Sequence, residues 1–190
     1  MKESKDIETA KRWKTLKSEY LIRRPWLTAR RDVVQLPNGE INDEFYVLEY
    51  PDWVNVIAIT EDDHFVFVRQ YRYALDVLSI ELCAGVAEPG ETIEQSARRE
   101  LLEETGYGGG EWREVMTIGQ NPSTCNNLTH CFVAKGVKHL QEQHLDRTED
   151  IDVVLLTRDE VLDMLRGDTL KQALMLAPLW RYFATEELEK

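Results

Sequence analysis

Three glutamates stand where one face of a helix would carry them together, at positions 100, 103 and 104. Side chains three and four residues apart are neighbours on a helix, and like charges there repel, so we expect a cation between them. Oxygen ligands on a rigid element suit Mg²⁺ or Mn²⁺, which complete their shells with water and substrate phosphates. Glu100, Glu103 and Glu104 are therefore predicted to hold a divalent metal that acts on phosphate groups.

The helix that must carry these glutamates has clear ends in the sequence. Thr92 is a typical N-cap residue, apolar residues follow it at spacings of four, and Gly106 is a typical stop. We therefore predict a helix from Thr92 to Thr105. Glu91 and Arg99 are expected to pair, which would brace the preceding loop against the helix.

A longer pattern surrounds the three glutamates. Fixed residues frame them, namely Gly85, Glu91, Arg99 and Gly106. A charged helix face that is merely solvated is the simple alternative. Seven fixed residues, each at a frequency of about 6 to 7%, match by chance about once in 10⁸ starting points. Coincidence is therefore rejected in favour of a functional motif.

The pattern resembles the signature of the Nudix hydrolases, G-x5-E-x7-R-E-U-x-E-E-x-G-U, where U is bulky and apolar. Every fixed position matches, and the one small departure is Tyr107, where the family usually has an aliphatic residue. The resemblance implies an α+β protein, a Nudix α/β/α sandwich with a mixed sheet and the motif as loop-helix-loop. It also implies hydrolysis of a nucleoside diphosphate linked to another group, with Gly85, Glu91 and Gly106 in structural roles.

The flanks of the motif resemble the family branch that cleaves ADP-ribose and other nucleoside-diphosphate sugars. Residues 68–72, VRQYR, precede the motif, and residues 81–85, ELCAG, lead into it. The resemblance implies that Arg72 contacts the diphosphate and that Glu81 helps to hold a metal or its water. It also implies that the Ala84 carbonyl is a metal ligand beside the helix glutamates.

Three further positions bear on this branch. Arg69 is a candidate substrate ligand, with a solvent-facing strand arginine as the alternative. Cys83 stands where the branch usually has proline, so this position departs from the pattern. Pro122 lies where another mark of the branch is found, about fifteen residues beyond the motif.

The attacking water needs a base or a metal to become a nucleophile. Residues 146–151, DRTEDI, resemble the mobile loop that carries the base in this branch, and Glu149 is the candidate. An acidic loop that only interacts with solvent is the alternative, and Glu103 is then the expected base. Arg99 completes the set of residues that we expect to be catalytic.

The N-terminal segment is basic and differs in composition from the rest of the chain. We divide the chain into an N-terminal arm, 1–31, and a Nudix domain, 32–190, and expect the arm to form a homodimer. Trp13 and Trp26 resemble the two aromatic residues that sandwich the base in dimeric members, and Arg31 would reach the phosphates. Packing of both tryptophans in a hairpin or a dimer interface is the alternative.

Hydrophobic patterning predicts the elements around the motif. Asn38-Gly39 between two strand-like runs predicts an antiparallel hairpin, and residues 53–60 and 65–71 predict a second pair. Further strands are expected in WREVMTIG, LTHCFVAKG and DVVLLT. Helical periodicity follows in TRDEVLDMLRGD and in residues 169–190, where Pro178 is expected to interrupt the helix.

Composition argues against several classes of protein. The chain has 190 residues, of which 43% are hydrophobic, and its formal net charge of −12 argues against general affinity for DNA or RNA. No apolar run reaches the roughly eighteen residues needed to cross a bilayer, and the first residues lack a secretory signal. Three cysteines without CxxC spacing indicate neither a disulfide framework nor a zinc site. A cytoplasmic globular domain is expected.

We therefore expect a hydrolase that uses Mg²⁺ or Mn²⁺ to cleave ADP-ribose or a related nucleoside-diphosphate sugar into a nucleoside monophosphate and a sugar phosphate. One alternative is a different substrate, such as GDP-mannose, a dinucleotide or a deoxynucleoside triphosphate. Another is a protein that binds nucleotide sugars without cleaving them. The intact motif in a short, acidic chain argues against the second alternative.

Overall fold

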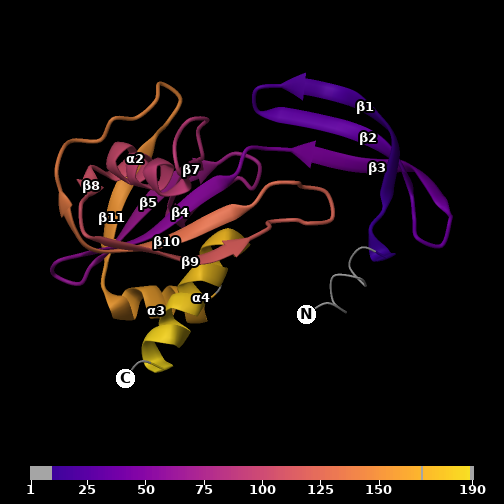
Figure 1. Cartoon of the computed structure of the whole chain (residues 1–190). Helices are drawn as coiled ribbons and strands as arrows, with labels where there is room; N and C mark the ends of the chain where they lie inside the picture. Colours follow the sequence, from indigo (N-terminus) through magenta and orange to yellow (C-terminus); the bar gives the residue numbers. More distant parts are fainter. Residues whose placement is uncertain (1–9, 168, 189–190) are drawn as a thin grey trace. The chain divides into compact units, whose positions relative to one another are not determined.

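The computed structural model describes residues 10–167 and 169–188, and the chain divides into two compact units (Figure 1). The first unit is Met1–Tyr50 with Asn121–Asn127, and the second is Pro51–Gln120 with Leu128–Lys190. Residues 1–9 of the expected arm lie outside the described residues.

The first unit is larger than the arm expected from the sequence. The boundary placed after Arg31 falls inside a strand, and Arg31 pairs with Glu19 on one side and with Tyr46 on the other. A division at that point would break two ladders of main-chain hydrogen bonds. The compact unit therefore extends to Tyr50.

The first unit contains a three-stranded antiparallel sheet. Its strands are β1 (Lys14–Arg24), β2 (Leu27–Gln35) and β3 (Ile41–Glu49). The turn from β2 to β3 contains Asn38-Gly39, and Gly39 has a φ of 91°, a left-handed conformation that favours glycine. The predicted hairpin is therefore confirmed. Every residue of β1 is exposed, so this strand is an open edge of the sheet.

The second unit is built on a mixed eight-stranded sheet. Its strands are β4 (Trp53–Thr60), β5 (Phe65–Arg72), β6 (Val77–Glu81), β7 (Cys83–Val86), β8 (Tyr107–Gly108), β9 (Glu111–Ile118), β10 (Thr129–His139) and β11 (Ile151–Leu156). The order is β11-β5-β4-β10-β8, with β6 beside β5, β7 beside β4 and β9 beside β10. β4 and β10 are parallel, whereas β4 and β5 are antiparallel. The predicted strand pair and the later strands are confirmed.

Helices cover both faces of this sheet (Figure 1). The helices are α2 (Ile93–Thr105), α3 (Arg158–Arg166) and α4 (Ala173–Leu188). Alternation along β4 separates the two cores: Val54 and Val56 pack in the core with α2, and Ile57 and Ile59 pack in the core with α3 and α4. The expected α/β/α sandwich of the α+β class is therefore confirmed.

α2 begins and ends where the sequence indicates. The Thr92 hydroxyl accepts a hydrogen bond from the Gln95 N–H, and the Gln95 side chain accepts one from the Thr92 N–H, which makes a capping box. Gly106 has a φ of 74° and donates its N–H to Leu102 at 2.9 Å. A Cβ atom at position 106 would also overlap the main-chain oxygen of Gln141, so both conformation and space require glycine.

The interruption expected at Pro178 is wrong, because α4 continues through this residue. Proline has no N–H, which leaves the carbonyl oxygen of Leu174 without its helical partner. The side chain of Asn55, fully buried on β4, donates a hydrogen bond of 2.8 Å to that oxygen. An amide from the sheet thus replaces the bond that proline removes.

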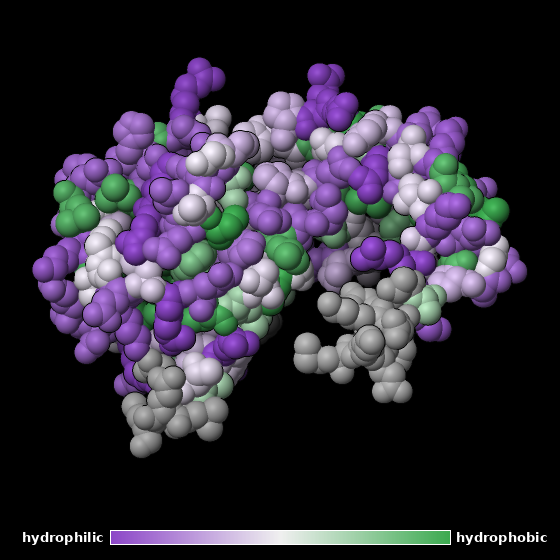
Figure 2. Space-filling model, in the orientation of Figure 1, coloured by the Kyte–Doolittle hydropathy of each residue, from purple (hydrophilic) through white to green (hydrophobic). Residues whose placement is uncertain are grey.

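The cysteines are free thiols in this fold, and two of them, Cys83 and Cys131, are buried. Cys83 packs in the core between the sheet and α2, so a small apolar side chain fills this place. None of the described helices is long and apolar enough to span a membrane. The molecular face drawn in Figure 2 is largely hydrophilic, with hydrophobic residues in small separate areas.

Candidate active site

Gly85, the first residue of the motif, lies directly against Glu100 of α2. A Cβ atom at Gly85 would overlap the carboxyl group of Glu100. The Val86 N–H donates to Glu100 at 3.2 Å, and the Ala84 N–H donates to Glu104 at 3.2 Å. Glycine at position 85 therefore allows two helix glutamates to lie directly against β7.

Arg99 joins the charged residues of the motif. Its Nε donates to both carboxylate oxygens of Glu91 at 3.2 Å, and its Nη1 donates to Glu100 at 2.9 Å and to Glu103 at 3.1 Å. Its Nη2 donates to the Val86 carbonyl at 3.1 Å. Burial opposes the charge of Arg99, but the hydrogen bonds and charge of Glu100 outweigh it and raise the arginine pKa. The guanidinium is thus a permanent cation between the loop and the glutamates.

Glu104 is buried and Glu100 is partly buried in this group. Glu104 is 6% exposed, and its burial raises its pKa to about 7, with the negative charges of Glu100 and Glu149 adding to the rise. Burial also raises the pKa of Glu100, although Arg99 acts in the opposite direction. A nearby cation would favour the charged form of both carboxyl groups. The local electrostatics therefore favour added positive charge.

The donor set fits a hard divalent cation. Glu100, Glu103 and Glu104 offer carboxylate oxygens on one helix, beside the main chain of Ala84. Mg²⁺ keeps several waters and needs only a few protein carboxylates. In residues 10–167 and 169–188, no three His, Cys, Asp or Glu side chains are grouped around one metal position, and Arg99 bonds two of the glutamates. The glutamates of the motif thus lie together as candidate metal ligands, and Arg99 holds Glu100 and Glu103 through hydrogen bonds.

Arg72 and Glu81 form a two-point ion pair between β5 and β6. The Arg72 Nε lies 2.8 Å from one oxygen of Glu81, and its Nη2 lies 2.5 Å from the other. The hydrogen bonds that Arg72 donates to Glu81 raise the pKa of Arg72, and Arg72 lines the same hollow as Ala84. Arg69 lies on the opposite face of β5 and bonds Asp152 at 2.8 Å. The structure thus brings Arg72 and Glu81 to the motif and places Arg69 elsewhere on the sheet.

The loop that carries Glu149 is tied to the last turn of α2. The Gln143 side chain donates to the main-chain oxygen of Glu104 at 2.6 Å, and the His144 N–H donates to that of Glu103 at 2.9 Å. Glu149 itself is exposed. Sequence reasoning missed Gln143 and His144, because a side chain or loop amide that satisfies the end of a distant helix follows no local pattern.

The residues expected to bind the base and the phosphates belong to the first unit. Trp13 packs edge-on against Phe45 with ring centroids 5.7 Å apart, Trp26 is 84% exposed, and Arg31 bonds Glu19 at 2.7 Å. Trp13 and Trp26 flank the whole of β1, whose eleven residues at about 3.3 Å each span roughly 36 Å. Within one chain they cannot sandwich one base, so their expected role requires two copies of the chain.

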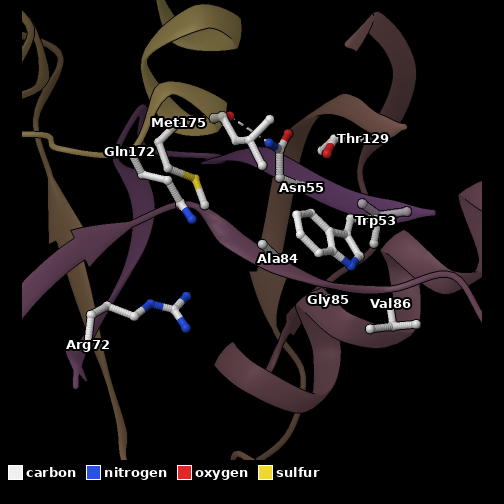
Figure 3. Close-up of a pocket in the computed structure, with 11 residues that line it drawn as sticks. Trp53, Asn55, Arg72, Ala84, Gly85, Val86, Thr129, Gln172 and Met175 are labelled. Carbon is white, nitrogen blue, oxygen red and sulfur yellow. Dashed lines mark hydrogen bonds between the residues drawn. The ribbon is translucent and has the colours of Figure 1, made fainter. Parts of the chain in front are cut away.

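A hollow of about 220 Å³ opens beside the motif, and we call it the side pocket (Figure 3). Arg72, Ala84 and Gly85 line it next to the motif. The rest of its wall comes from β4, β10 and the start of α4, and includes Trp53, Asn55, Thr129, Gln172 and Met175. Sequence reasoning missed this pocket. The available signal was a polar residue, Asn55, inside the otherwise apolar strand WVNVIAIT.

Comparison with protein families decides the assignment. Residues 50–176 match the NUDIX domain, and residues 13–48 match the nucleoside diphosphate sugar hydrolase N-terminal domain. The chain belongs to the Nudix family. The two matches meet where the two compact units divide, close to Tyr50. The expected family is therefore confirmed, and this Nudix chain carries an N-terminal unit with a family match of its own.

Individual relatives agree with this assignment. The chain is 35% identical over 154 residues to the methanol dehydrogenase activator of Bacillus methanolicus, covering 80% of this chain and 83% of that protein. It is 29% identical over 155 residues to the ADP-ribose pyrophosphatase of Bacillus subtilis (strain 168), covering 81% and 83%. The crystal structure of an ADP compounds hydrolase matches the fold with a TM-score of 0.82 at 20% identity, covering 94% of this chain and 96% of that one. The protein is a Nudix hydrolase.

Proposed function

We propose that this Nudix hydrolase cleaves the diphosphate bond of ADP-ribose or a related nucleoside-diphosphate sugar, with Mg²⁺ or Mn²⁺ as cofactor. The products are a nucleoside monophosphate and a sugar phosphate. The observation that carries the proposal is the cluster of Glu100, Glu103 and Glu104 around Arg99 and against Ala84. The name of the Bacillus subtilis relative and the match of the N-terminal unit support the substrate class.

Different residues around the motif would bind the metal and the diphosphate. A divalent cation held by the three glutamates and the Ala84 carbonyl would polarise the phosphate and lower the pKa of an attacking water. Arg99 keeps Glu100 and Glu103 in place through its fixed charge. Arg72 donates to Glu81 through its Nε and Nη2, which holds the guanidinium in position, and its Nη1 would donate to the diphosphate. Arg69 is a weaker candidate for substrate contact, because it bonds Asp152.

The reaction is a displacement at phosphorus. The water oxygen forms a bond to one phosphorus as the bond from that phosphorus to the bridging oxygen breaks, and the leaving phosphate takes the electron pair. The water proton goes to a carboxylate. Glu149 is the proposed base, and its negative charge is close enough to affect the pKa of Glu104. If Glu149 only faces solvent, Glu103 takes this role.

The first unit supplies the proposed base-binding residues in a homodimer. Trp26 is exposed and offers a free aromatic face, and Trp13 of a second copy would offer the other. Arg31 would exchange Glu19 for a substrate phosphate. We further propose that the enzyme works in the cytoplasm, since the buried free thiols of Cys83 and Cys131 suit a reducing compartment.

A second candidate function is activation of a dehydrogenase. The name of the Bacillus methanolicus relative states this activity for that protein, and the identity of 35% extends over most of both chains. The test is to add this protein to a methanol dehydrogenase and to measure the rate of methanol oxidation. A rise with the wild-type protein that is lost with Glu104→Gln would show that activation depends on the candidate active site.

The experiment that tests the proposed function is a substrate panel in Mg²⁺ buffer, with the products separated by chromatography. The panel contains ADP-ribose, ADP-glucose, GDP-mannose, UDP-glucose, NADH, diadenosine polyphosphates and deoxynucleoside triphosphates. Preferential conversion of ADP-ribose or another nucleotide sugar to a nucleoside monophosphate supports the proposal. Preference for a dinucleotide or a triphosphate would keep the Nudix chemistry but overturn the substrate class. Cleavage of none would favour a protein that binds nucleotide sugars without cleaving them.

A further inference from the structure

The side pocket holds polar atoms that the fold leaves unsatisfied. Among the described residues, Asn55 Oδ1, Thr129 Oγ1 and Gln172 Oε1 are buried oxygens of its wall without a hydrogen-bond partner. Asn55 is fully buried, and Thr129 is 2% exposed. Buried polar atoms are nearly always hydrogen-bonded in native proteins, so three such atoms in one small hollow call for a partner that enters it.

The orientation of Asn55 defines what that partner must offer. Its Nδ2 is already committed to the main-chain oxygen of Leu174, the bond that lets α4 pass through Pro178. The amide cannot rotate without losing this bond, so Oδ1 faces its surroundings as an acceptor. Figure 3 shows Asn55 and Thr129 side by side at the wall, with the indole of Trp53 beside them. The partner must therefore bring hydrogen-bond donors to this side.

The size of the side pocket limits the partner to one group of a larger ligand. Its volume of about 220 Å³ is below the roughly 300–1,000 Å³ of pockets that enclose a whole small molecule. Arg72, Ala84 and Gly85 line the pocket where it meets the motif. A group joined to the diphosphate at the motif would thus reach the pocket directly.

The number of hydrogen-bond acceptors in the side pocket indicates whether a sugar or a base fits it better. Adenine offers donors at a single exocyclic amine, whereas a sugar ring carries several hydroxyls around its edge, each of which donates and accepts. The three oxygens belong to Asn55 on β4, Thr129 on β10 and Gln172, which directly precedes α4, so they match donors spread around a ring. The apolar face of Trp53 suits the C–H face of a sugar as well as a base. The choice between sugar and base therefore rests on the three acceptor oxygens, which favour a sugar.

We propose that the side pocket binds the sugar on the non-nucleotide side of the diphosphate, with Asn55, Thr129 and Gln172 accepting its hydroxyl donors. This inference rests on the proposed function, because it assumes a nucleoside-diphosphate sugar at the motif. It gives the sugar a place in the second unit, where every residue of the side pocket lies. The three polar residues then determine which sugars are accepted.

Calorimetric titration with ribose 5-phosphate and with AMP, each in Mg²⁺ buffer, tests this proposal. Thr129→Val keeps the shape of the side chain and removes its hydroxyl, so the Kd for ribose 5-phosphate is expected to rise about 3- to 10-fold, the effect of one hydrogen bond. The Kd for AMP is expected to stay unchanged. The matched control is Thr117→Val on β9, whose hydroxyl bonds Glu114 and which does not line the side pocket.

Gln172→Leu is the second variant, in case Thr129→Val does not fold, and the same selective loss is expected. An effect on AMP alone would overturn the proposal and place the base in the side pocket. Unchanged binding of both compounds in both variants, or no binding of ribose 5-phosphate to the wild-type protein, would also contradict it. If the wild-type protein binds ribose 5-phosphate through Thr129 but cleaves no nucleotide sugar, the proposed function fails and the sugar site stands.

Discussion

The carboxyl group of Glu100 lies in the space that a Cβ atom of residue 85 would need, so Gly85 and Glu100 fit together only while residue 85 is glycine. Glu100 also accepts the Val86 N–H at 3.2 Å, which fixes its position against β7. This relationship explains in physical terms why the motif begins with glycine fifteen residues before the glutamate. The requirement is for space, because Gly85 does not have a positive φ.

Gly85→Ala is therefore expected to displace Glu100 and to lower kcat by about 100-fold, the effect of a misplacement near 1 Å in an active site. The measurement is nucleotide-sugar hydrolysis in Mg²⁺ buffer together with urea unfolding. Gly39→Ala is the control: it strains a left-handed turn in the first unit and costs stability, but it is expected to leave kcat unchanged. Normal activity of Gly85→Ala would show that Glu100 is not held as described.

Glu104 makes the stability of the metal-free protein depend on pH. Its pKa is raised by burial to about 7 from the ordinary value of 4.5, so the folded state holds this proton more tightly than the unfolded state. The contribution to the free energy of unfolding is complete below the unfolded pKa and is lost as the pH rises through the folded pKa. It amounts to about 3 kcal/mol at most.

The measurement is the urea midpoint of the wild-type protein and of Glu104→Gln, with a chelator, from about pH 4 to pH 8. We expect the wild-type protein to lose stability relative to the variant as the pH rises across this range. Added Mg²⁺ is expected to restore stability to the wild-type protein above pH 7, because a cation favours the charged carboxylate. A difference between the two proteins that does not change with pH would contradict the assignment to Glu104.

Glu149→Gln tests the proposed base. Glutamine still accepts the Asp146 N–H that Glu149 accepts at 2.8 Å, so the loop turn is kept while the proton acceptor is lost. We expect kcat to fall about 100-fold or more and KM to change little. Glu142→Gln, an exposed glutamate of the same loop, is the control. If kcat is unchanged in Glu149→Gln, the base lies elsewhere and Glu103 is the next candidate.

Gln143 is expected to act as a positioning residue for this loop. Gln143→Leu removes the donor to the main-chain oxygen of Glu104, so the loop should separate more easily from α2. We expect kcat to fall about 10-fold and hydrogen exchange of the loop amides to become faster. Gln141→Leu, which changes an exposed side chain nearby, should do neither. Slower turnover without faster exchange would argue against a positioning role.

Local rules account for the parts of the fold that the sequence predicts. Thr92 and Gln95 cap α2 within one turn, Gly106 ends it, and Asn38-Gly39 closes a hairpin between adjacent strands. Each of these features depends on residues a few positions apart. The motif itself is equally local, so its glutamates could be grouped on one helix face from spacing alone.

Features that join distant residues could not be predicted in this way. The partner of the Leu174 carbonyl is Asn55, which lies 119 residues away in the sequence. When this partner is not known, Pro178 predicts a break in the helix. The extent of the first unit depends on the pairing of β2 with β3. The change in composition near residue 31 gives no information about this pairing. The side pocket likewise combines residues of four strands, β4, β5, β7 and β10, with the start of α4.

The central claim is that the Glu100, Glu103 and Glu104 cluster performs metal-dependent hydrolysis of a nucleotide sugar. The most direct measurement is the release of AMP from ADP-ribose by the wild-type protein and by Glu104→Gln, each with Mg²⁺ and with a chelator. We predict steady AMP release by the wild-type protein in Mg²⁺, none with the chelator, and a rate at least about 100-fold lower in the variant. No release by the wild-type protein, or equal rates in the two proteins, would contradict the claim.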